Sequence, residues 1–212
     1  MTKPYLVPLT EIRREQEVLK SRFIATLAPA FSIDEARAFM KRIRAEFADA
    51  SHNVPVYIIG GGNTVTEDFS DDGEPVGTSG KPALAVLRGS GLGDVVLVVT
   101  RYFGGTLLGT GGLVKAYTEA AQSVVNAVER GHRVPVHVAM MAIPYNLLER
   151  VRLLVSKDHG KILGEDYAGD ITLTLLFPIE NFDAFQADMR ELSAGKIQAE
   201  VIESKEEIVP AA

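Results

Sequence analysis

The sequence predicts an α+β protein built from two domains. Strand-like apolar runs alternate with helical patterns, a break containing glycine and proline falls at residues 131–135, and the order of elements changes after it. Beyond the break the order is β-α-β-β-α-β, the split βαβ arrangement of a ferredoxin-like fold. We therefore expect an N-terminal domain at residues 1–133 and a ferredoxin-like domain at residues 134–212.

The N-terminal domain is expected to begin with two paired strands, at residues 15–18 and 22–27, followed by a capped helix. Ser32 and Glu35 have the spacing of a capping box, and helical periodicity follows at residues 36–47. The elements expected next are a strand at 54–60, a helical turn or short helix at 82–87, a buried strand at 95–101 and a long helix at 112–129.

The C-terminal domain is expected to alternate strands and helices. Pro144 lies where the first turn of a helix tolerates proline, because the missing amide has no helical partner there. The tail at residues 206–212 is expected to fray. The expected elements are strands at 136–142, 161–167, 170–177 and 196–203, and helices at 145–156 and 180–192.

Composition excludes several classes of protein. The chain of 212 residues is 46% hydrophobic, which is enough for real cores. No apolar run approaches the ~18 residues of a membrane-spanning helix, and the N-terminus lacks the basic-then-apolar layout of a signal peptide. The absence of cysteine excludes disulfides, a thiol nucleophile and thiolate metal sites. We expect a cytoplasmic protein without membrane contact.

Charge divides unevenly between the two domains. Residues 1–133 hold 15 Lys and Arg against 15 Asp and Glu, a net of zero, whereas residues 134–212 hold 7 against 13, a net of −6. Neither part is a basic body of the kind that binds duplex nucleic acid by bulk charge. We expect no specificity for DNA, and any contact with RNA has to come from a local patch.

The stretch from residue 71 to residue 117 is the candidate site, because two glycine-dense loops flank one apolar strand there. Its first motif holds Asp71, Asp72 and Glu74, with Asp68 just upstream. These carboxylates suit a magnesium ion held through water, or a turn in which aspartates bond their own backbone. The turn is favoured, because divalent sites usually recruit distant ligands as well.

The second motif, at residues 77–82, contains Gly80 and Lys81 but is not a phosphate loop of the Walker type. The first glycine of that pattern would fall on Pro75, and Pro82 replaces the hydroxyl that binds magnesium. A milder interpretation stays open. Backbone amides at residues 76–80 can form an anion-binding nest.

The third motif places Arg101, Tyr102 and Phe103 at a strand end, ahead of glycines and a helix start. Arg101 suits a phosphate contact, the aromatic side chains suit stacking on a base, and the helix amides suit an anion. An equally good interpretation is structural: Phe103 lies in the core, Arg101 pairs with Asp71 or Asp72, and the glycines allow tight packing. Both interpretations stay open.

Smaller signals complete the set. Lys20 and Arg22 flank a serine beside Phe23, which suits either a phosphate-backbone contact or a solvated turn. His52 suits a general base, although a single histidine before a strand is more often a surface or capping residue. The other histidines have no metal-binding spacing, and neither a Ser/His/Asp order nor a GxSxG elbow supports a hydrolase triad.

Together these motifs resemble the IMPACT (YigZ) family, in its bacterial two-domain type. The motif residues match over roughly residues 15–130, and the two-domain layout extends the likeness over nearly the whole chain. The motif residues that carry the resemblance are the segment from Lys20 to Phe23, His52, the residues from Asp71 to Pro75, the residues from Gly77 to Gly80, Pro82, the residues from Arg101 to Gly105, the residues from Leu108 to Leu113, and Tyr117.

The resemblance implies a fold for each domain. The N-terminal domain is expected to have the fold of the second domain of a small-subunit ribosomal protein, a sheet with helices on one face. The C-terminal domain is expected to be ferredoxin-like. Elongation factor G carries the same two folds in succession, the second as its domain V, which is an analogy of fold only.

The resemblance also implies a role in translation or a stress response. The eukaryotic relative restrains a starvation-sensing kinase by competing for its ribosome-associated activator. We expect a regulatory binding protein that contacts RNA, the ribosome or a translation-associated protein, without a cofactor; the oligomeric state is not fixed by the sequence. The candidate binding residues are Lys20, Arg22, Asp72, Gly73, Glu74, Thr78, Ser79, Gly80, Arg101, Tyr102, Phe103, Gly104, Gly105, Gly109, Gly111 and Gly112.

An enzyme is the alternative. In that hypothesis the chain is a magnesium-dependent enzyme acting on a phosphorylated or nucleotide-like small molecule. Asp71, Asp72 and Glu74 would hold the metal, and His52 would serve as acid and base. The binding protein is preferred, because the chain has no recognisable catalytic constellation.

Overall fold

The computed structural model describes residues 5–61 and 64–210. Contacts divide the chain into two compact units, one running up to Arg133 and including the stretch from Ile208, the other Val134–Glu207. Within the described ranges, no helix combines the length and the apolar character needed to cross a membrane. The domain limits drawn from the sequence, 1–133 and 134–212, stay a prediction.

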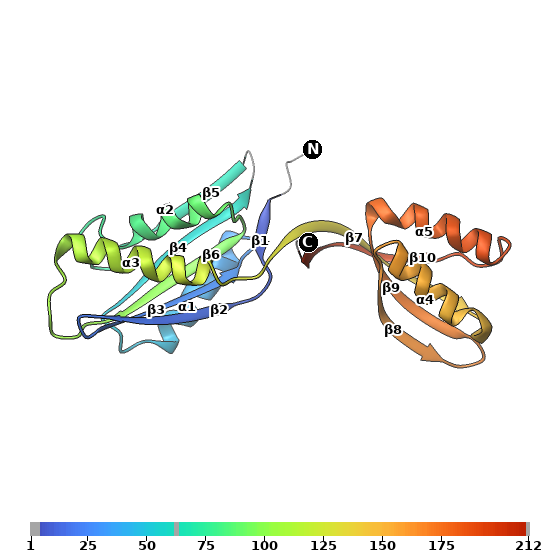
Figure 1. The fold of residues 1–212 in the computed structure, drawn as a ribbon, viewed down its shortest axis with the longest axis horizontal. Coiled ribbons are helices and arrows are strands. Elements are labelled where there is room, and N and C mark those ends of the chain that lie inside the picture. The colour runs from blue at the N-terminus through green and yellow to red at the C-terminus, as the bar shows by residue number, and fades with distance from the viewer. Residues whose placement is uncertain (1–4, 62–63, 211–212) are drawn as a thin grey trace. The chain divides into compact units, whose positions relative to one another are not determined.

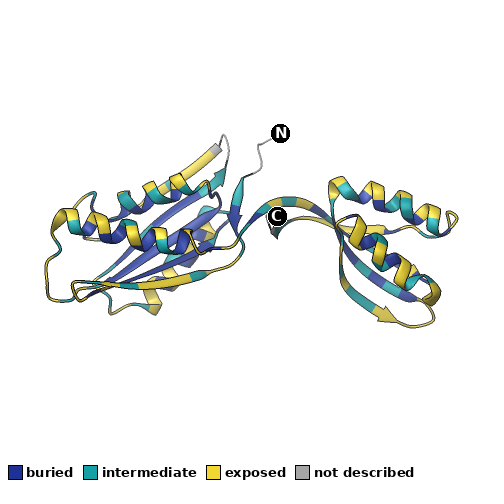
Figure 2. Ribbon diagram, viewed as in Figure 1, coloured by how far each residue is buried: buried dark blue, intermediate teal, exposed yellow. Residues whose placement is uncertain are grey.

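The first unit contains an antiparallel five-stranded sheet (Figure 1). Its central strand β6 is apolar, whereas the outer strand β2 is rich in charged residues. Figure 2 shows that the central strands are buried and that the outer strands are more exposed. The strand at residues 64–69 was not expected from the sequence. In spatial order the strands are β2 (Ile12–Val18), β3 (Ser21–Pro29), β6 (Val95–Tyr102), β4 (His52–Gly61) and β5 (Thr64–Phe69).

Helices cover both faces of this sheet. Helices α2 (Gly80–Ser90) and α3 (Gly109–Val125) pack on one face, over a core that includes Leu97 of β6. Helix α1 (Ile33–Glu46) packs on the other face, against Val96 and its like-facing neighbours. The expectation of helices on one face was therefore wrong. Successive residues of β6 point to opposite faces, and both sets are apolar, so each face needs a cover.

The helix ends follow local chemistry. The Ser32 hydroxyl accepts a hydrogen bond from the Glu35 amide at 3.1 Å, and the Glu35 carboxylate accepts one from Phe31 at 2.8 Å, which confirms the predicted cap. The short helix expected at residues 82–87 is α2, which extends by two residues to the N-terminal side and three to the C-terminal side. Gly91 ends α2 with a φ of 73°, a left-handed conformation that glycine adopts at low cost.

The second unit has the predicted ferredoxin-like order. Its sheet is arranged β10–β7–β9–β8, and a short strand, β1, also pairs with the first residues of β7. This is the strand order of a split βαβ fold, and the fold class expected from the sequence is confirmed. The elements are β7 (Arg130–Ile143), the 3-10 helix η1 (Tyr145–Leu147), α4 (Leu148–Lys157), β8 (Lys161–Tyr167), β9 (Ile171–Pro178), α5 (Ile179–Leu192) and β10 (Glu200–Pro210). Strand β1 (Leu6–Pro8) and the start of β7 up to Arg133 belong by their contacts to the first unit.

Two expectations near the ends of this unit were wrong. The break expected at residues 131–135 does not interrupt the secondary structure, because β7 begins at Arg130 and runs through Pro135. The tail from residue 206 does not fray within the described part, because β10 continues to Pro210. In both places pairing between distant strands overrides the local turn signal, and sequence periodicity does not report such pairing.

Candidate binding site at the ends of β4 and β6

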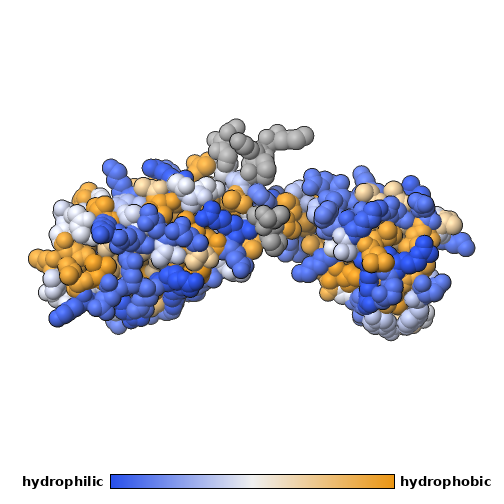
Figure 3. Space-filling view, in the orientation of Figure 1, coloured by the Kyte–Doolittle hydropathy of each residue, from blue (hydrophilic) through white to orange (hydrophobic). Residues whose placement is uncertain are grey.

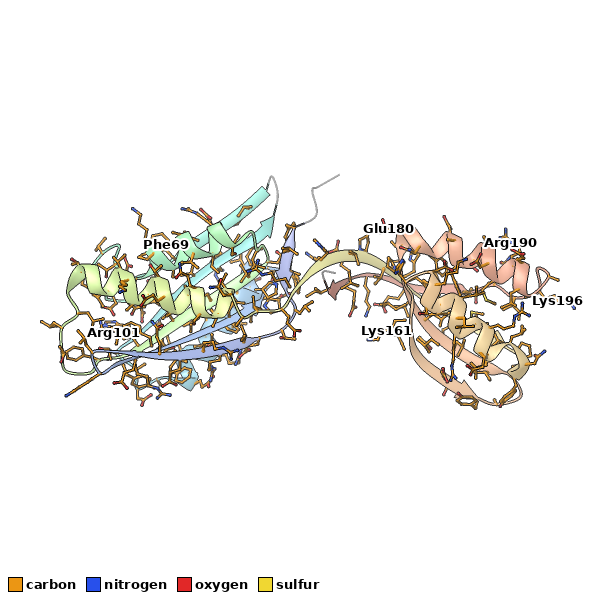
Figure 4. The ribbon with its side chains drawn as sticks, in the orientation of Figure 1. Phe69, Arg101, Lys161, Glu180, Arg190 and Lys196 are labelled. Carbon is orange, nitrogen blue, oxygen red and sulfur yellow. The ribbon has the colours of Figure 1, made fainter. Side chains whose placement is uncertain are left out.

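The candidate site lies where β4 begins and β6 ends. Antiparallel pairing sets His52 of β4 opposite Arg101 of β6, and Arg101 opposite Phe23 of β3. Figure 4 labels Arg101 at this end of the sheet, near the start of α3. Three strands thus bring together motifs that are separated by up to 80 residues along the chain.

A buried polar network forms the centre of the site. Glu74 Oε1 accepts a hydrogen bond from Arg101 Nη1 at 2.7 Å and another from the Tyr117 hydroxyl at 2.8 Å. The side chains of Glu74 and Arg101 are 3% and 6% exposed. Burial, and then the charge of Glu74, raise the pKa of Tyr117, so that the hydroxyl stays a donor. The network joins the loop before α2 to β6 and α3.

Aromatic rings enclose the Arg101 guanidinium. It lies 5.5 Å from the ring centroid of Phe23 and 5.7 Å from that of Phe103, and Phe23 meets Tyr117 edge to face at 5.3 Å. Arg101 Nε has no hydrogen-bond partner among the described residues. Two parts of the structural interpretation were therefore wrong. Arg101 pairs with Glu74 and not with Asp71 or Asp72, and Phe103 is 48% exposed and does not lie in the core.

His52 and Asp72 tie the loop to β4. His52 Nδ1 lies 2.8 Å from the carbonyl oxygen of Asp72, and its Nε2 lies 3.8 Å from Glu74 Oε1. The Asp72 carboxylate accepts from the Asn53 amide at 2.6 Å and from Arg44 Nη2 at 2.5 Å. His52, Glu74 and Arg101 therefore do meet in one place, a juxtaposition that the sequence alone did not fix.

The anion-binding nest expected at residues 76–80 is occupied by the protein itself. The Asp71 carboxylate accepts hydrogen bonds from the backbone amides of Gly77 at 2.7 Å, Ser79 at 3.2 Å and Gly80 at 2.9 Å. It also accepts one from the Ser79 hydroxyl at 2.7 Å. Burial by itself raises the pKa of Asp71. The hydrogen bonds together lower the pKa by more than burial raises it, so the net shift is downward. The nest has no amide left for an external anion at these three positions.

The carboxylates of the loop serve separate partners. Asp71 caps the amides before α2, Asp72 bonds Arg44 and β4, and Glu74 bonds Arg101 and Tyr117. Among the described residues no three His, Asp or Glu side chains are grouped to hold a metal ion. This favours the turn interpretation of the motif over a magnesium site.

The second glycine loop is held against the turn between β2 and β3. A Cβ on Gly104 would lie 2.0 Å from the Lys20 carbonyl carbon and 2.4 Å from the Ser21 nitrogen, so only glycine fits. The Gly104 amide donates to the Ser21 hydroxyl oxygen at 3.2 Å. Lys20 itself has a φ of 65°, an uncommon conformation for a side-chain-bearing residue.

The remaining predicted residues are spread over this end of the unit. Arg22 pairs with Glu15 and lies over the Tyr102 ring at 5.6 Å, while the Tyr102 hydroxyl donates to Asp49. The Thr78 hydroxyl donates to the Pro75 carbonyl, which places it within the loop. Backbone positions with positive φ are Gly73, Gly105 and Gly109, and the first turn of α3 holds Gly111 and Gly112.

Sequence reasoning missed three polar residues of the site. Ser21 is fully buried and accepts from both Gly104 and Arg101; its place between Lys20 and Arg22 was the available signal. The Ser51 hydroxyl accepts from the Phe103 amide at 3.1 Å, and Arg44 pairs with Asp72. Nothing local distinguishes Arg44 from the other cations of α1.

Comparisons with known proteins follow the division of the chain. The Impact N-terminal domain matches residues 19–125, and a domain of unknown function (DUF1949) matches residues 141–196. The IMPACT family member YigZ of Escherichia coli is 37% identical over 94% of this chain and 98% of its own length. The chain belongs to the IMPACT family. The family motif is thus the segment from β3 to α3 that builds the buried network.

This member of the IMPACT family is also similar to a solved structure and to a vertebrate protein. The crystal structure of a hypothetical protein, 36% identical, covers 96% of this chain and 99% of its own with a TM-score of 0.63. Protein IMPACT of Xenopus laevis is 34% identical over 94 residues, which are 42% of this chain and 30% of the frog protein. The bacterial likeness therefore extends over both domains, whereas the vertebrate likeness covers a part of the chain.

Proposed function

We propose that this IMPACT-family chain is a cytoplasmic regulatory binding protein, linked to translation or a stress response, that docks on a translation-associated protein. The observation that carries the proposal is a set of exposed apolar side chains at the tips of the loops around the buried network. We call it the loop-tip surface. Its residues and exposed fractions are Leu19 at 60%, Val76 at 97%, Phe103 at 48% and Leu107 at 84%.

Exposed apolar side chains on well-fixed loops suit a protein partner. Large apolar residues that gather on a surface mark interaction sites more often than single scattered ones do. Figure 3 shows apolar atoms gathered at this end of the first unit. The loops are held by the contacts of Glu74, Asp71 and Gly104, so little conformational entropy is lost when they bind.

The charges beside the loop-tip surface favour protein over RNA. Arg22 pairs with Glu15, Arg44 with Asp72, and Arg101 with Glu74. In the segment from Lys20 to Phe23, Lys20 has no ion-pair partner among the described residues, whereas Arg22 is paired. A phosphate backbone is bound mainly by unpaired Lys and Arg, and such cations are scarce here. Arg101 is buried, so in this proposal it positions the loops and does not contact the partner.

The link to translation comes from the family. The resemblance implies that the eukaryotic relative acts in translational control. Protein IMPACT of Xenopus laevis is 34% identical to this chain over 94 residues. The activator for which the eukaryotic relative competes need not exist for this protein, because the resemblance implies that the eukaryotic relative carries a different companion domain. We therefore carry over from the family only the class of partner, a translation-associated protein. Experiment has to identify the partner itself.

The test is capture of ribosomes and translation-associated proteins from a lysate of the source cells by the full chain. Phe103→Ser combined with Leu107→Ser is expected to weaken capture about tenfold or more, as loss of central apolar contacts does. Leu153→Ser, which removes a side chain 71% exposed on α4, is the matched control and should leave capture unchanged.

Salt separates the two classes of partner. Capture that persists at high salt supports a protein contact, because apolar burial is not screened. Capture that is lost steeply with salt and abolished by ribonuclease would instead identify RNA. Capture of neither ribosomes nor translation proteins, by wild type and variant alike, would refute the proposed link to translation.

A further inference from the structure

A groove runs between α2 and α3. The two helices lie side by side on one face of the first unit's sheet (Figure 1), and the cavity between them has a volume of about 850 Å³. Both helices, Gly77 of the loop before α2 and the first residue of β7 line it. The volume is in the range of sites that bind small ligands or short peptide segments.

The wall formed by α2 contains Pro82 and Val86, but one row along it narrows to alanine and glycine. Lys81, Ala85 and Gly89 follow one another at intervals of four residues, so they lie in one row along the helix. A Cβ added at Gly89 would meet nothing within 4 Å, so the groove is open at this point. A main chain can approach the helix closely at Ala85 and Gly89, because little or no side chain holds it off there.

The wall formed by α3 changes from apolar to amide. Val114, Thr118, Gln122 and Asn126 form its row, again at intervals of four residues. The Thr118 hydroxyl donates to the Val114 carbonyl within the helix. The side chains of Gln122 and Asn126 make no hydrogen bond within the described parts of the chain. Each amide carries donors and an acceptor, the set that pairs with an extended peptide main chain.

The charges of the groove have one sign. Lys81 lies at one end and Arg130 at the other, and among the residues that the structure describes no carboxylate lines the space between them. Arg130 donates to the carbonyls of Ser90 at 3.3 Å and Val125 at 2.9 Å, so its charge is not cancelled by an acid there. The rise from Lys81 to Gly89 is roughly 12 Å, which corresponds to about four residues of extended chain.

We propose that this α2–α3 groove binds a short extended segment of a partner protein that carries carboxylates at both ends and small or apolar residues between them. The cations at the ends recognise the carboxylates, the amides of Gln122 and Asn126 pair with the main chain, and the Ala85–Gly89 wall admits it. The proposal does not rest on the loop-tip surface.

The test is selection of random short peptides displayed against the full chain, with binders of a Gly89→Leu variant removed. The leucine fills the groove, and it favours the helix over glycine, so the variant should fold as well as the wild type. We expect selected peptides to be rich in Asp and Glu around an apolar centre. No peptide surviving the subtraction, or survivors without excess acid, would overturn the proposal.

Charge variants then locate the contact. Lys81→Glu is expected to weaken the selected peptide about tenfold, a typical cost of losing one central contact. Two variants on α1, which covers the opposite face of the sheet, are the matched controls: Lys41→Glu for Lys81→Glu, and Ala38→Leu for Gly89→Leu. Both should leave the affinity unchanged. Equal losses with Lys81→Glu and Lys41→Glu would overturn the assignment to the groove. Phe103→Ser with Leu107→Ser should leave peptide binding intact, which separates this site from the loop-tip surface.

Discussion

Glu74 and Arg101 form an ion pair inside the core, not a surface contact. Their side chains are almost fully enclosed, and Tyr117 adds a hydrogen bond to the same carboxylate oxygen. Taking charges out of water is costly, and the cost is offset only while both partners are present. The pair therefore acts as a fixed point: it holds the loop before α2 onto the end of β6.

Removing one partner of this pair is expected to destabilise the fold. Glu74→Ala leaves Arg101 buried without its carboxylate, and the free energy of unfolding should fall by about 3–5 kcal/mol. Urea denaturation followed by circular dichroism measures the loss. Glu67→Ala, which breaks the more exposed pair with Arg88, is the control and should cost less than about 1 kcal/mol.

The double variant Glu74→Leu with Arg101→Met tests the explanation. Two apolar side chains of similar size remove both buried charges, so most of the lost stability should return. A double variant as unstable as Glu74→Ala would show that the loss does not come from the unpaired charge of Arg101, and would assign it to packing and to the Tyr117 hydroxyl, which loses its acceptor.

Asp71 should make stability depend on acid. Its folded-state pKa is lowered from the ordinary value of 3.8, so its contribution is present above that value and is lost as the pH falls through the folded value. Asp71→Asn is expected to cost about 1–2 kcal/mol at neutral pH, like the loss of a helix cap. Denaturation at several pH values should show this difference shrinking as the pH falls below 3.8 and through the lower pKa of the folded state. A difference that stays constant with pH would contradict the charged role.

At the scale of elements, the glycines of the two loops have different reasons to be glycine. Gly104 lies against the backbone of the β2–β3 turn, which cannot move aside as a flexible side chain can. Gly105 has a φ of 83° with open space around it, so a side chain there meets only backbone strain. Gly111 lies in the first turn of α3 with neither constraint. The glycines of these loops thus meet three different physical requirements, although the residue type is the same.

Alanine at these positions should separate the roles. Gly104→Ala is expected to detach the loop from the turn and cost more than about 3 kcal/mol, in the range of severe backbone conflicts. Gly105→Ala should cost about 1–2 kcal/mol through its positive φ. Gly111→Ala should stabilise the helix by up to about 1 kcal/mol. Thermal denaturation of the three variants gives the order, and equal effects at all three would refute the assignment.

At the scale of the molecule, the two units have separate cores. The first unit buries apolar side chains on both faces of its sheet, and the second buries its own set around Phe177 and Phe185, whose rings stack at 4.4 Å. Each core forms from its own elements. We propose on this basis that the two domains respond separately to damage in their cores.

Core substitutions in the second unit should therefore act locally. Phe185→Ala is expected to cost that unit about 3–5 kcal/mol, because it leaves a cavity among close-packed rings. Hydrogen exchange measured by mass spectrometry should accelerate in α4, α5 and β9 and stay unchanged in β3 and β6. Leu97→Ala in the first unit should give the reverse pattern. Faster exchange throughout the chain with either variant would contradict separate cores.

The sequence predicted much of the fold but less of the site. Helical periodicity and the Ser32 cap located α1, and the hairpin of β8 and β9 follows from two apolar runs with Ala168 and Gly169 between them. The site differed because its contacts are distant in sequence. The choice of Glu74 over Asp71 as the partner of Arg101 depends on which carboxylate the turn directs inward, and no local pattern reports that direction.

The sequence by itself determined the fold class and the family, and it marked candidate residues of the site without showing which of them meet. Period and capping act over a few residues, so they can be read along the chain. The tertiary structure alone decided that α1 covers the second face of the sheet, that β7 runs through the expected break, and that Asp71 fills the nest once assigned to a ligand. These depend on pairing and burial between distant segments, which only the folded chain brings together.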